Sequence, residues 1–292
     1  MKRATVHDVA AEARVSLATV DRVLNQRPGV KASTIERVHD AIQRIGFTRD
    51  QHAANLAKRR EYRVCFLLPA GDSAFMQQLR AEVERNISIE RQQRTFIKVR
   101  DILPFDGASL VEALDSISAE EFTGVVFIAT DVPQVKQAIK RLADRGIILI
   151  TLVSDIPSSA RAHFVGIDNT AAGRTAGSLL GRFVSSGDKV AVIAGSMLLQ
   201  DHVDRRRGFE QVIRTEFPEI KLIPTMETND DHVAAEKIVD DLLEQYPDLQ
   251  GIYNIGTAKQ GLVTSLKRHQ RNGKVRIVAH DLTDDSKEAL RD

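Results

Sequence analysis

The amino-acid sequence of 292 residues predicts a small all-α head followed by a larger, two-lobed α/β body. Three short amphipathic segments with helical spacing fill the first 48 residues. From residue 62 onward, short apolar strands alternate with amphipathic helices, which is typical of parallel sheets covered by helices on both faces. The polar stretch DIPSSARAH, residues 155–163, is the best candidate for the boundary between lobes of about 62–160 and 161–292.

The head is predicted to begin with two helices separated by a short turn. The first helix follows Thr5, which makes a capping-box pattern with Asp8. The second is VSLATVDRVLN, residues 15–25, in which Ser16 is a natural N-cap. Only ARVS joins the two helices, and this spacing is typical of a helix-turn-helix.

The second helix has two different sides. Its apolar side is formed by Val20, Val23 and Leu24. A third helix is expected over residues 33–45, ended by Gly46. Because the three apolar stripes then bury one another, the outer side of the second helix is free to enter a DNA major groove. That outer side consists of Leu17, Ala18, Asp21, Arg22 and Asn25.

The charges of the chain favour the same role for the head. Residues 1–60 hold 12 Lys/Arg against 6 Asp/Glu, whereas the remainder holds 29 against 34. The overall net charge of +1 therefore combines a basic head with a mildly acidic body. This asymmetry predicts that the head contacts a polyanion, although chance clustering of solvated charges would give the same count.

Three segments of the head together resemble the DNA-binding segment of the lactose-repressor (LacI-type) family. They are TVHDVAAEARVSLATVDRVLN, IERVHDAIQRIGF and HAANLAKRR, and the resemblance covers residues 4–60. It implies that Leu17, Ala18 and Arg22 read bases, with Arg22 pairing to a guanine. It also implies that DNA phosphates are contacted by Ser16, Thr19 and Asn25, and we include Thr5 among the DNA contacts. On its residue type alone, Arg22 would be a solvated charge.

Two residues of the head depart from the family pattern. Asp21 stands where the family usually has Ser, and we expect its carboxylate to accept a hydrogen bond from a cytosine amino group or to orient Arg22. Arg14 replaces the usual glycine of the turn, which predicts backbone strain and an added phosphate contact.

Residues 49–61 are expected to form a hinge helix or linker between head and body. In the family the matching segment becomes helical on DNA, and the residue that matches Leu56 wedges into the minor groove. The resemblance therefore makes Leu56 the candidate wedge. Without it, Leu56 would be an ordinary packing residue.

Eight apolar segments of the body are expected to be strands. They are RVCFLLPA, FIKVRDIL, GVVFIAT, IILITLVS, HFVGID, KVAVIAGS, GIYNIG and VRIVAHDL. In sheets of this kind, ligand sites lie at the carboxyl ends of the strands, and two facing lobes form a cleft. A binding cleft between the lobes of residues 62–292 is therefore expected.

The body resembles the ligand domain of the same family, which is of the periplasmic sugar-binding-protein type. FVGIDNTAAGRTAG and DRRRGF carry the resemblance, which covers most of residues 62–290. It implies that Arg205 and Asp281 hold ligand hydroxyls, a pair that suits a polyol. It also implies a polar contact from Ser73 and ring stacking on Phe75 and Met76.

Other expected ligand contacts follow from positions where this chain differs from sugar-binding relatives. Asn254 and Thr257 stand where the family often carries an acid-bearing pair. Ser154, with Val153, stands where sugar binders often carry Asp and Arg, which argues against ribose. Simpler roles are open for several residues: a solvated helix start for Arg205, a turn cap for Asp281, core packing for Phe75, and helix capping for Asp168 and Asn169.

The composition and motifs exclude other classes of protein. Hydrophobic residues make up 42% of the chain and charged residues 28%, as in a globular protein, and no apolar run approaches the ~20 residues of a membrane helix. The start lacks the apolar core of a signal peptide, and the single cysteine, Cys65, is expected to pack in a core. No H-x-x-x-H, G-x-S-x-G or P-loop pattern is present, so we expect no active site, metal or cofactor.

The sequence thus predicts a cytoplasmic, nucleoid-associated bacterial transcription regulator, most simply a repressor. We expect a homodimer or a tetramer on a near-palindromic double-stranded operator, controlled by a sugar or polyol effector. The alternative is a stand-alone carbohydrate-binding protein whose head has lost operator recognition. Family members usually continue past DDSKEALRD, so the C-terminal end is expected to be truncated.

Overall fold

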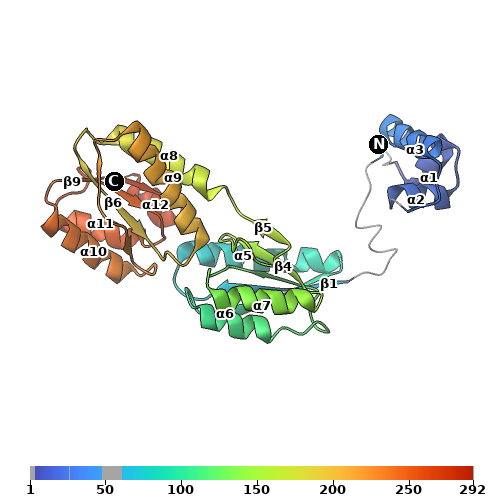
Figure 1. Ribbon diagram of the computed structural model, residues 1–292, viewed down its shortest axis with the longest axis horizontal. Helices are drawn as coiled ribbons and strands as arrows, with labels where there is room; N and C mark the ends of the chain where they lie inside the picture. Colours follow the sequence, from blue (N-terminus) through green and yellow to red (C-terminus); the bar gives the residue numbers. More distant parts are fainter. Residues whose placement is uncertain (1–3, 26, 48–60, 292) are drawn as a thin grey trace. The chain divides into compact units, whose positions relative to one another are not determined.

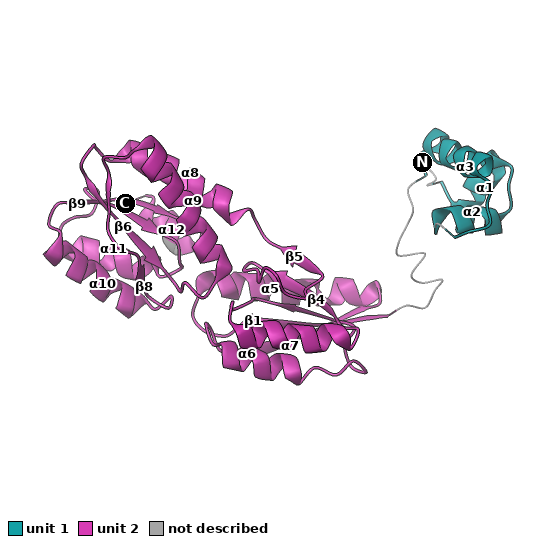
Figure 2. Ribbon diagram, viewed as in Figure 1, with its two compact units in different colours: residues 1–60 teal, residues 61–292 magenta. Residues whose placement is uncertain are grey.

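The computed structural model describes residues 4–25, 27–47 and 61–291. The chain divides into two compact units, residues 1–60 and 61–292 (Figure 2). Residues 49–60 of the expected hinge, with Leu56, lie outside the described residues. In the described part, no helix has the length and apolar character needed to cross a membrane.

Three helices form the head: α1 (Val6–Ala13), α2 (Leu17–Leu24) and α3 (Ala32–Ile45). One side chain from each helix, Val9, Val20 and Val38, is fully buried where they meet. Each such burial contributes roughly 1.5–3 kcal/mol to stability. The apolar stripes expected from the sequence therefore do bury one another, and they leave the outer side of α2 uncovered.

The turn between α1 and α2 contains the predicted backbone strain. Arg14 ends α1 with a φ of 52°, in the left-handed region that favours glycine. Gly46 ends α3 in the same region, with a φ of 62°, as its position predicts.

The first lobe of the body is a five-stranded parallel sheet in the order β2-β1-β3-β4-β5. The strands are β1 (Tyr62–Pro69), β2 (Thr95–Ile102), β3 (Gly124–Phe127), β4 (Ile148–Leu152) and β5 (His163–Val165). Helices α6 (Gly107–Asp115) and α7 (Pro133–Asp144) pack side by side on one face, and α5 (Ala74–Gln92) lies on the other (Figure 1). Cys65 is buried in this core, as expected.

The second lobe is a parallel sheet in the order β10-β9-β6-β7, with β8 also paired to β6. The strands are β6 (Lys189–Ala194), β7 (Lys221–Leu222), β8 (Met226–Glu227), β9 (Leu249–Asn254) and β10 (Arg276–Ala279). Helices α8 (Asn169–Phe183) and α9 (Gln200–Glu216) cover one face, and α10 (His232–Gln245) and α11 (Lys259–Arg268) cover the other (Figure 1). A short helix, α12 (Asp284–Ala289), follows β10.

All eight predicted strands are present, and two features differ from the sequence prediction. Strand β5 pairs with β4, so the first sheet extends to Val165 and the boundary set at residue 161 is too early. Strands β7 and β8 were not expected, because two-residue strands carry no periodicity that a sequence pattern can show.

Candidate functional site

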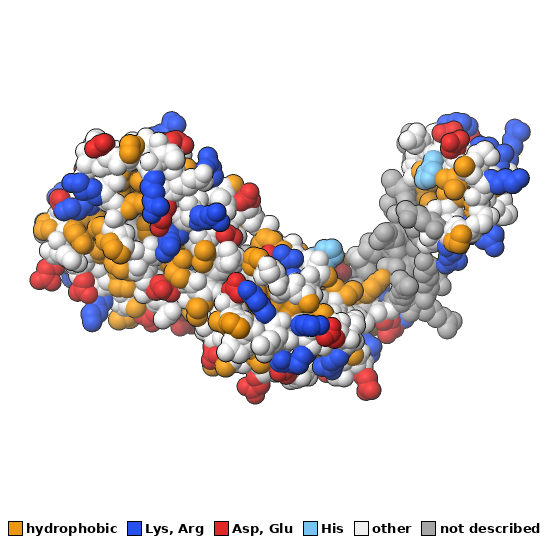
Figure 3. All heavy atoms as spheres, viewed as in Figure 1, with side chains coloured by type: hydrophobic (Ala, Val, Ile, Leu, Met, Phe, Trp, Pro, Cys, Tyr) orange, Lys and Arg blue, Asp and Glu red, His pale blue; other side chains and the backbone are white. Residues whose placement is uncertain are grey.

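The outer face of α2 is exposed, as a DNA-reading face must be. Leu17 is 43% exposed, and Ala18, Asp21 and Arg22 are also exposed. Lys and Arg side chains gather around the head in Figure 3. The head thus presents apolar, acidic and basic side chains on one short helix that its own core does not use.

The start of α2 carries two hydroxyl groups side by side. Ser16 is the N-cap, and its Oγ accepts a hydrogen bond from the Thr19 backbone N–H at 3.2 Å. The Oγ of Ser16 also lies 2.9 Å from the Oγ1 of Thr19. Since a helix N-terminus attracts anions, these hydroxyls stand where a phosphate oxygen is favoured. Thr5, in contrast, donates through its Oγ1 to its capping partner Asp8 at 2.7 Å.

Asp21 contacts Asn25 and Arg27 within the head. Its Oδ1 accepts a hydrogen bond from Asn25 Nδ2 at 2.7 Å, and its Oδ2 lies 3.3 Å from Arg27 Nη1. Among the described residues, no contact joins the carboxylate to Arg22. The suggestion that Asp21 orients Arg22 is therefore wrong for this structure, whereas the contact with a cytosine stays a prediction.

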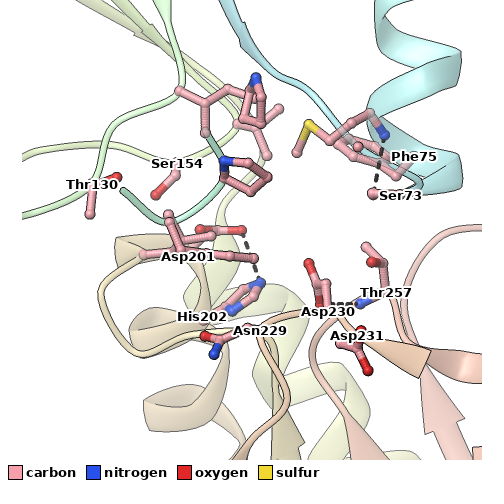
Figure 4. Close-up of a pocket in the computed structure, with 18 of the residues that line it drawn as sticks. Ser73, Phe75, Thr130, Ser154, Asp201, His202, Asn229, Asp230, Asp231 and Thr257 are labelled. Atoms are coloured by element: carbon pink, nitrogen blue, oxygen red, sulfur yellow. Dashed lines mark hydrogen bonds and ion pairs between the residues drawn. The ribbon is translucent and has the colours of Figure 1, made fainter. Parts of the chain in front are cut away.

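A cavity of about 260 Å³ lies within the body at the carboxyl ends of strands from both sheets (Figure 4). Residues 69–71 reach it from the end of β1, Thr130 from the loop after β3, and Ser154 from the loop after β4. The second lobe contributes Thr257 after β9 and Asp281 after β10. Parallel topology brings these strand ends to one edge of each sheet, as expected for a ligand cleft.

Most of the expected ligand residues line this cavity. They are Ser73, Phe75, Met76, Ser154, Arg205, Thr257 and Asp281. Asn254 does not line it: its side chain is buried, and its Nδ2 donates to the Gly256 carbonyl at 2.9 Å. Asn254 therefore stabilises the loop after β9 instead of facing the cavity.

Arg205 is held inside the second lobe. It is only 7% exposed, which excludes the interpretation of a solvated helix start. Its Nε donates to Asn169 Oδ1 at 2.8 Å, and its Nη1 donates to the Ile255 carbonyl at 3.3 Å. Asp168 caps α8 by accepting from the Ala171 N–H at 2.9 Å, as its simpler interpretation predicts.

A close approach between α8 and α9 fixes the position of the Arg205 helix. A Cβ atom on Gly208 would lie 2.1 Å from the Thr170 carbonyl oxygen, and one on Gly173 would lie 1.9 Å from the Arg205 carbonyl oxygen. Only glycine permits contacts this close, because any side chain would push the two helices apart. The first turns of α9 are therefore held at a fixed position in the lining of the cavity.

Sequence reasoning missed several polar residues of the lining. Two come from the first turn of α9, three from the segment between β8 and α10, and one from the first residue of α10. They are Asp201, His202, Asn229, Asp230, Asp231 and His232. The run TNDDH before a helical pattern was the available signal, but β8 is too short to reveal that this run follows a strand.

Three buried polar atoms of the lining have no hydrogen-bond partner among the described residues. They are Asp201 Oδ1, His232 Nδ1 and Thr257 Oγ1. Since an unsatisfied buried polar group costs about 1–3 kcal/mol, such groups are normally paired with protein, water or a ligand. Three of them around one cavity indicate a site for a polar ligand.

The loop after β10 in the second lobe contains Asp281 and a neutral histidine, His280. Lys259 Nζ donates to the carbonyl oxygens of His280 and Asp281 at 2.7 and 2.8 Å, which fixes a loop where Asp281 has a φ of 63°. Burial, with the nearby Arg205, His202 and Lys259, lowers the pKa of His280 to about 3. Its Nε2 lies 2.7 Å from Tyr253 Oη, and burial raises the pKa of Tyr253.

Two protein families match the two parts of the chain. Residues 5–50 match the family described as bacterial regulatory proteins, lacI family. Residues 64–292 match the periplasmic binding protein domain. The body of the chain is thus a periplasmic binding protein domain, and its head matches the lacI family.

Known proteins agree with both assignments. Catabolite control protein A of Staphylococcus aureus (strain MRSA252) is 26% identical over 210 residues, which cover 72% of this chain and 61% of that protein. The body of the chain also shares its fold with GanP, a glucose-galactose binding protein from Geobacillus stearothermophilus. That structure has a TM-score of 0.71 and 21% identity, with 80% of this chain and 82% of the other covered.

A second solved structure has the same fold. It is an ABC transporter solute binding protein from Burkholderia graminis C4D1M in complex with D-arabinose, with a TM-score of 0.70 and 22% identity over 80% of each chain. At this level of identity both structures support the fold alone. In this chain the shared fold consists of two parallel sheets whose strand ends face a cavity.

Proposed function

We propose that the chain is a sequence-specific DNA-binding transcription regulator controlled by a small sugar or polyol. The observation that carries the proposal is the exposed outer face of α2 on a head whose family is lacI. The cavity with unpartnered polar atoms in the body supplies a place for the effector. The protein acts in the cytoplasm, where the chromosomal DNA lies, and it has no catalytic role.

The head reads DNA through α2. Arg22 makes two hydrogen bonds to a guanine, and Leu17 and Ala18 contact thymine methyl groups. The hydroxyls of Ser16 and Thr19 bind phosphate at the helix N-terminus, with Asn25 and Thr5 as further backbone contacts. Two heads of a homodimer bind the halves of a near-palindromic operator, and Leu56 wedges into the minor groove between them.

The effector binds between the lobes and contacts both. Phe75 and Met76 of the first lobe cover its apolar face, while Arg205 and Asp281 of the second lobe hold its hydroxyls. The lobes already form hydrogen bonds to each other, since Ser154 Oγ accepts from the Gln200 N–H at 3.1 Å and the Asp131 N–H donates to the Leu198 carbonyl at 2.9 Å. A ligand changes DNA affinity only if it binds one lobe arrangement more tightly than another.

Selection of binding sites from a random double-stranded DNA library tests this proposal. The salt concentration must be fixed, because phosphate contacts make affinity strongly salt-dependent. We expect enrichment of a near-palindrome with a fixed half-site and a deformable central step. Salt-sensitive binding without an enriched sequence would contradict the proposal and favour a stand-alone carbohydrate-binding protein.

A further inference from the structure

The two walls of the cavity differ in chemistry. The first-lobe wall is mainly apolar and includes Pro69, Phe75, Met76, Ile102, Leu103, Pro104 and Phe105. The second-lobe wall carries four of the five aspartates that line the described cavity: Asp201, Asp230, Asp231 and Asp281. Figure 4 shows Phe75 on one side of the cavity, with Asp230 and Asp231 on the other. A ligand in this space therefore meets an apolar surface on one side and carboxylates on the other.

Asp201 is the most informative of these acids. It is only 3% exposed, and its Oδ1 has no hydrogen-bond partner among the described residues. Its other oxygen lies 3.8 Å from His202 Nε2, which is too far for a hydrogen bond. The ring of His202 is held from its other nitrogen, where Nδ1 lies 3.2 Å from Ser196 N and 3.0 Å from Ser196 O. A buried carboxylate left in this state needs a hydrogen-bond donor that the described residues do not supply, and a ligand in the cavity can provide it.

Two of the remaining acids of the wall accept hydrogen bonds from neutral backbone N–H groups. Asp230 Oδ1 accepts from the Thr257 N–H at 2.8 Å, and Asp231 Oδ1 accepts from the Ala234 N–H at 2.6 Å. Among the described residues, no Lys or Arg side chain forms an ion pair with any of the four. Arg205 is the only Lys or Arg in the described lining, and it donates to Asn169 and Ile255. The cavity is therefore negative, with five aspartates against one arginine.

We propose that the effector carries a protonated amine, so that it is an amino sugar or an aminated polyol. The inference rests on the proposed function, which places a sugar or polyol in this cavity. The ammonium group donates to Asp201, because a charge-assisted hydrogen bond satisfies a buried carboxylate better than a hydroxyl does. The carbon face of the ligand packs on Phe75 and Met76. Sugar phosphates and sugar acids are excluded by repulsion from the aspartates.

Calorimetric titration of the full chain with matched sugars tests the proposal. The probes are D-glucosamine and D-galactosamine, their N-acetyl forms, and D-glucose and D-galactose, at about pH 6.5, where such amines are protonated. We expect at least one amine to bind at least tenfold more tightly than both of its neutral counterparts. Equal or tighter binding of the neutral sugars would overturn this inference and leave the proposed function intact. Binding of no member of either series would contradict the sugar-binding role as well.

Replacing Asp201 with a neutral residue tests whether Asp201 causes the preference for the amine. Asp201→Asn keeps the shape of the side chain and should abolish the tenfold preference for the amine. The matched control is Asp204→Asn, on the same helix but outside the cavity lining, where Asp204 accepts a hydrogen bond from Gln200 at 2.9 Å. Circular dichroism on heating shows whether each variant folds. If a folded Asp201→Asn variant keeps the full preference, Asp201 does not bind the amine and the assignment is wrong.

Discussion

Arg22 in the head and Arg205 in the body show how differently one residue type is used in the two units. Arg22 is exposed on a short helix, where its guanidinium can reach a base edge. Arg205 is 7% exposed and is fixed by Asn169 and the Ile255 carbonyl. The head presents its functional groups outward on one element, whereas the body gathers them inward from many strand ends. In the head, the residues proposed to bind DNA can thus be changed without disturbing the core. In the body, the residues proposed to bind the ligand depend on their packed neighbours for their position.

The largest effect is expected from disturbing that packing. Gly208→Val would force α9 away from α8, because even a Cβ atom would lie 2.1 Å from the Thr170 carbonyl. We expect the body to lose about 3 kcal/mol of unfolding free energy, and α9 to carry Asp201 and Arg205 out of position. Chemical denaturation and sugar titration measure the two losses.

The control for this change is Ala171→Val, which places the same final side chain at an exposed position of α8. It should leave stability within about 0.5 kcal/mol. A Gly208→Val variant with the stability and ligand affinity of the original chain would show that the close helix approach does not position the site.

A smaller loss, confined to DNA binding, is expected for Arg22→Ala. Removing a bidentate contact to guanine costs about 1–3 kcal/mol, a roughly 5- to 150-fold loss of operator affinity, and relaxes specificity at one base pair. Sugar affinity should be unchanged. Fluorescence anisotropy with the selected operator and its single-base variants measures both effects, with Arg37→Ala, exposed on α3, as the control. Uniform weakening on all sequences would instead make Arg22 a phosphate contact.

The same contrast explains what could be predicted from the sequence. The head was predictable in detail, because its stripes and caps lie within a few residues of one another, as with Ser16 and Gly46. In the body, the parallel sheets and the cleft followed from the alternation of strands and helices, whereas the order of the strands did not. Asp201 and Asp230 could not be found, because their role depends on which strand ends the topology brings together. Asn254 was misassigned for the same reason. Its side chain forms a hydrogen bond with the Gly256 carbonyl and does not line the cavity.

A pH-dependent effect, small near neutral pH, is expected from His280. Its folded-state pKa of about 3 lies below the ordinary value of 6.5, so the unfolded chain binds a proton first as the pH falls. The stabilising contribution is therefore complete above about pH 6.5 and is lost between about pH 6.5 and pH 3, by up to about 1.4 kcal/mol per pH unit. Denaturation at a series of pH values should show a smaller slope for His280→Gln than for the original chain. His39→Gln, at an exposed position of the head, should leave the slope of the body unchanged.

The smallest effect is expected at the turn of the head. Arg14→Gly removes the left-handed strain at a φ of 52° and should stabilise the head by about 0.5–1 kcal/mol. Arg14→Ala keeps a Cβ atom and should give no such gain. Thermal unfolding of the full chain, followed by helical signal, measures the difference. If both variants unfold at the same temperature, the turn is not strained.

The central claim is that a ligand in the body changes DNA binding by the head. The most direct test measures affinity for the selected operator by fluorescence anisotropy, with and without a saturating concentration of the tightest-binding sugar from the calorimetric series. We predict a change of at least about fivefold, lost in Asp201→Asn, which should still bind the operator. An unchanged operator affinity in the saturated protein would contradict the claim and leave two independent binding modules on one chain.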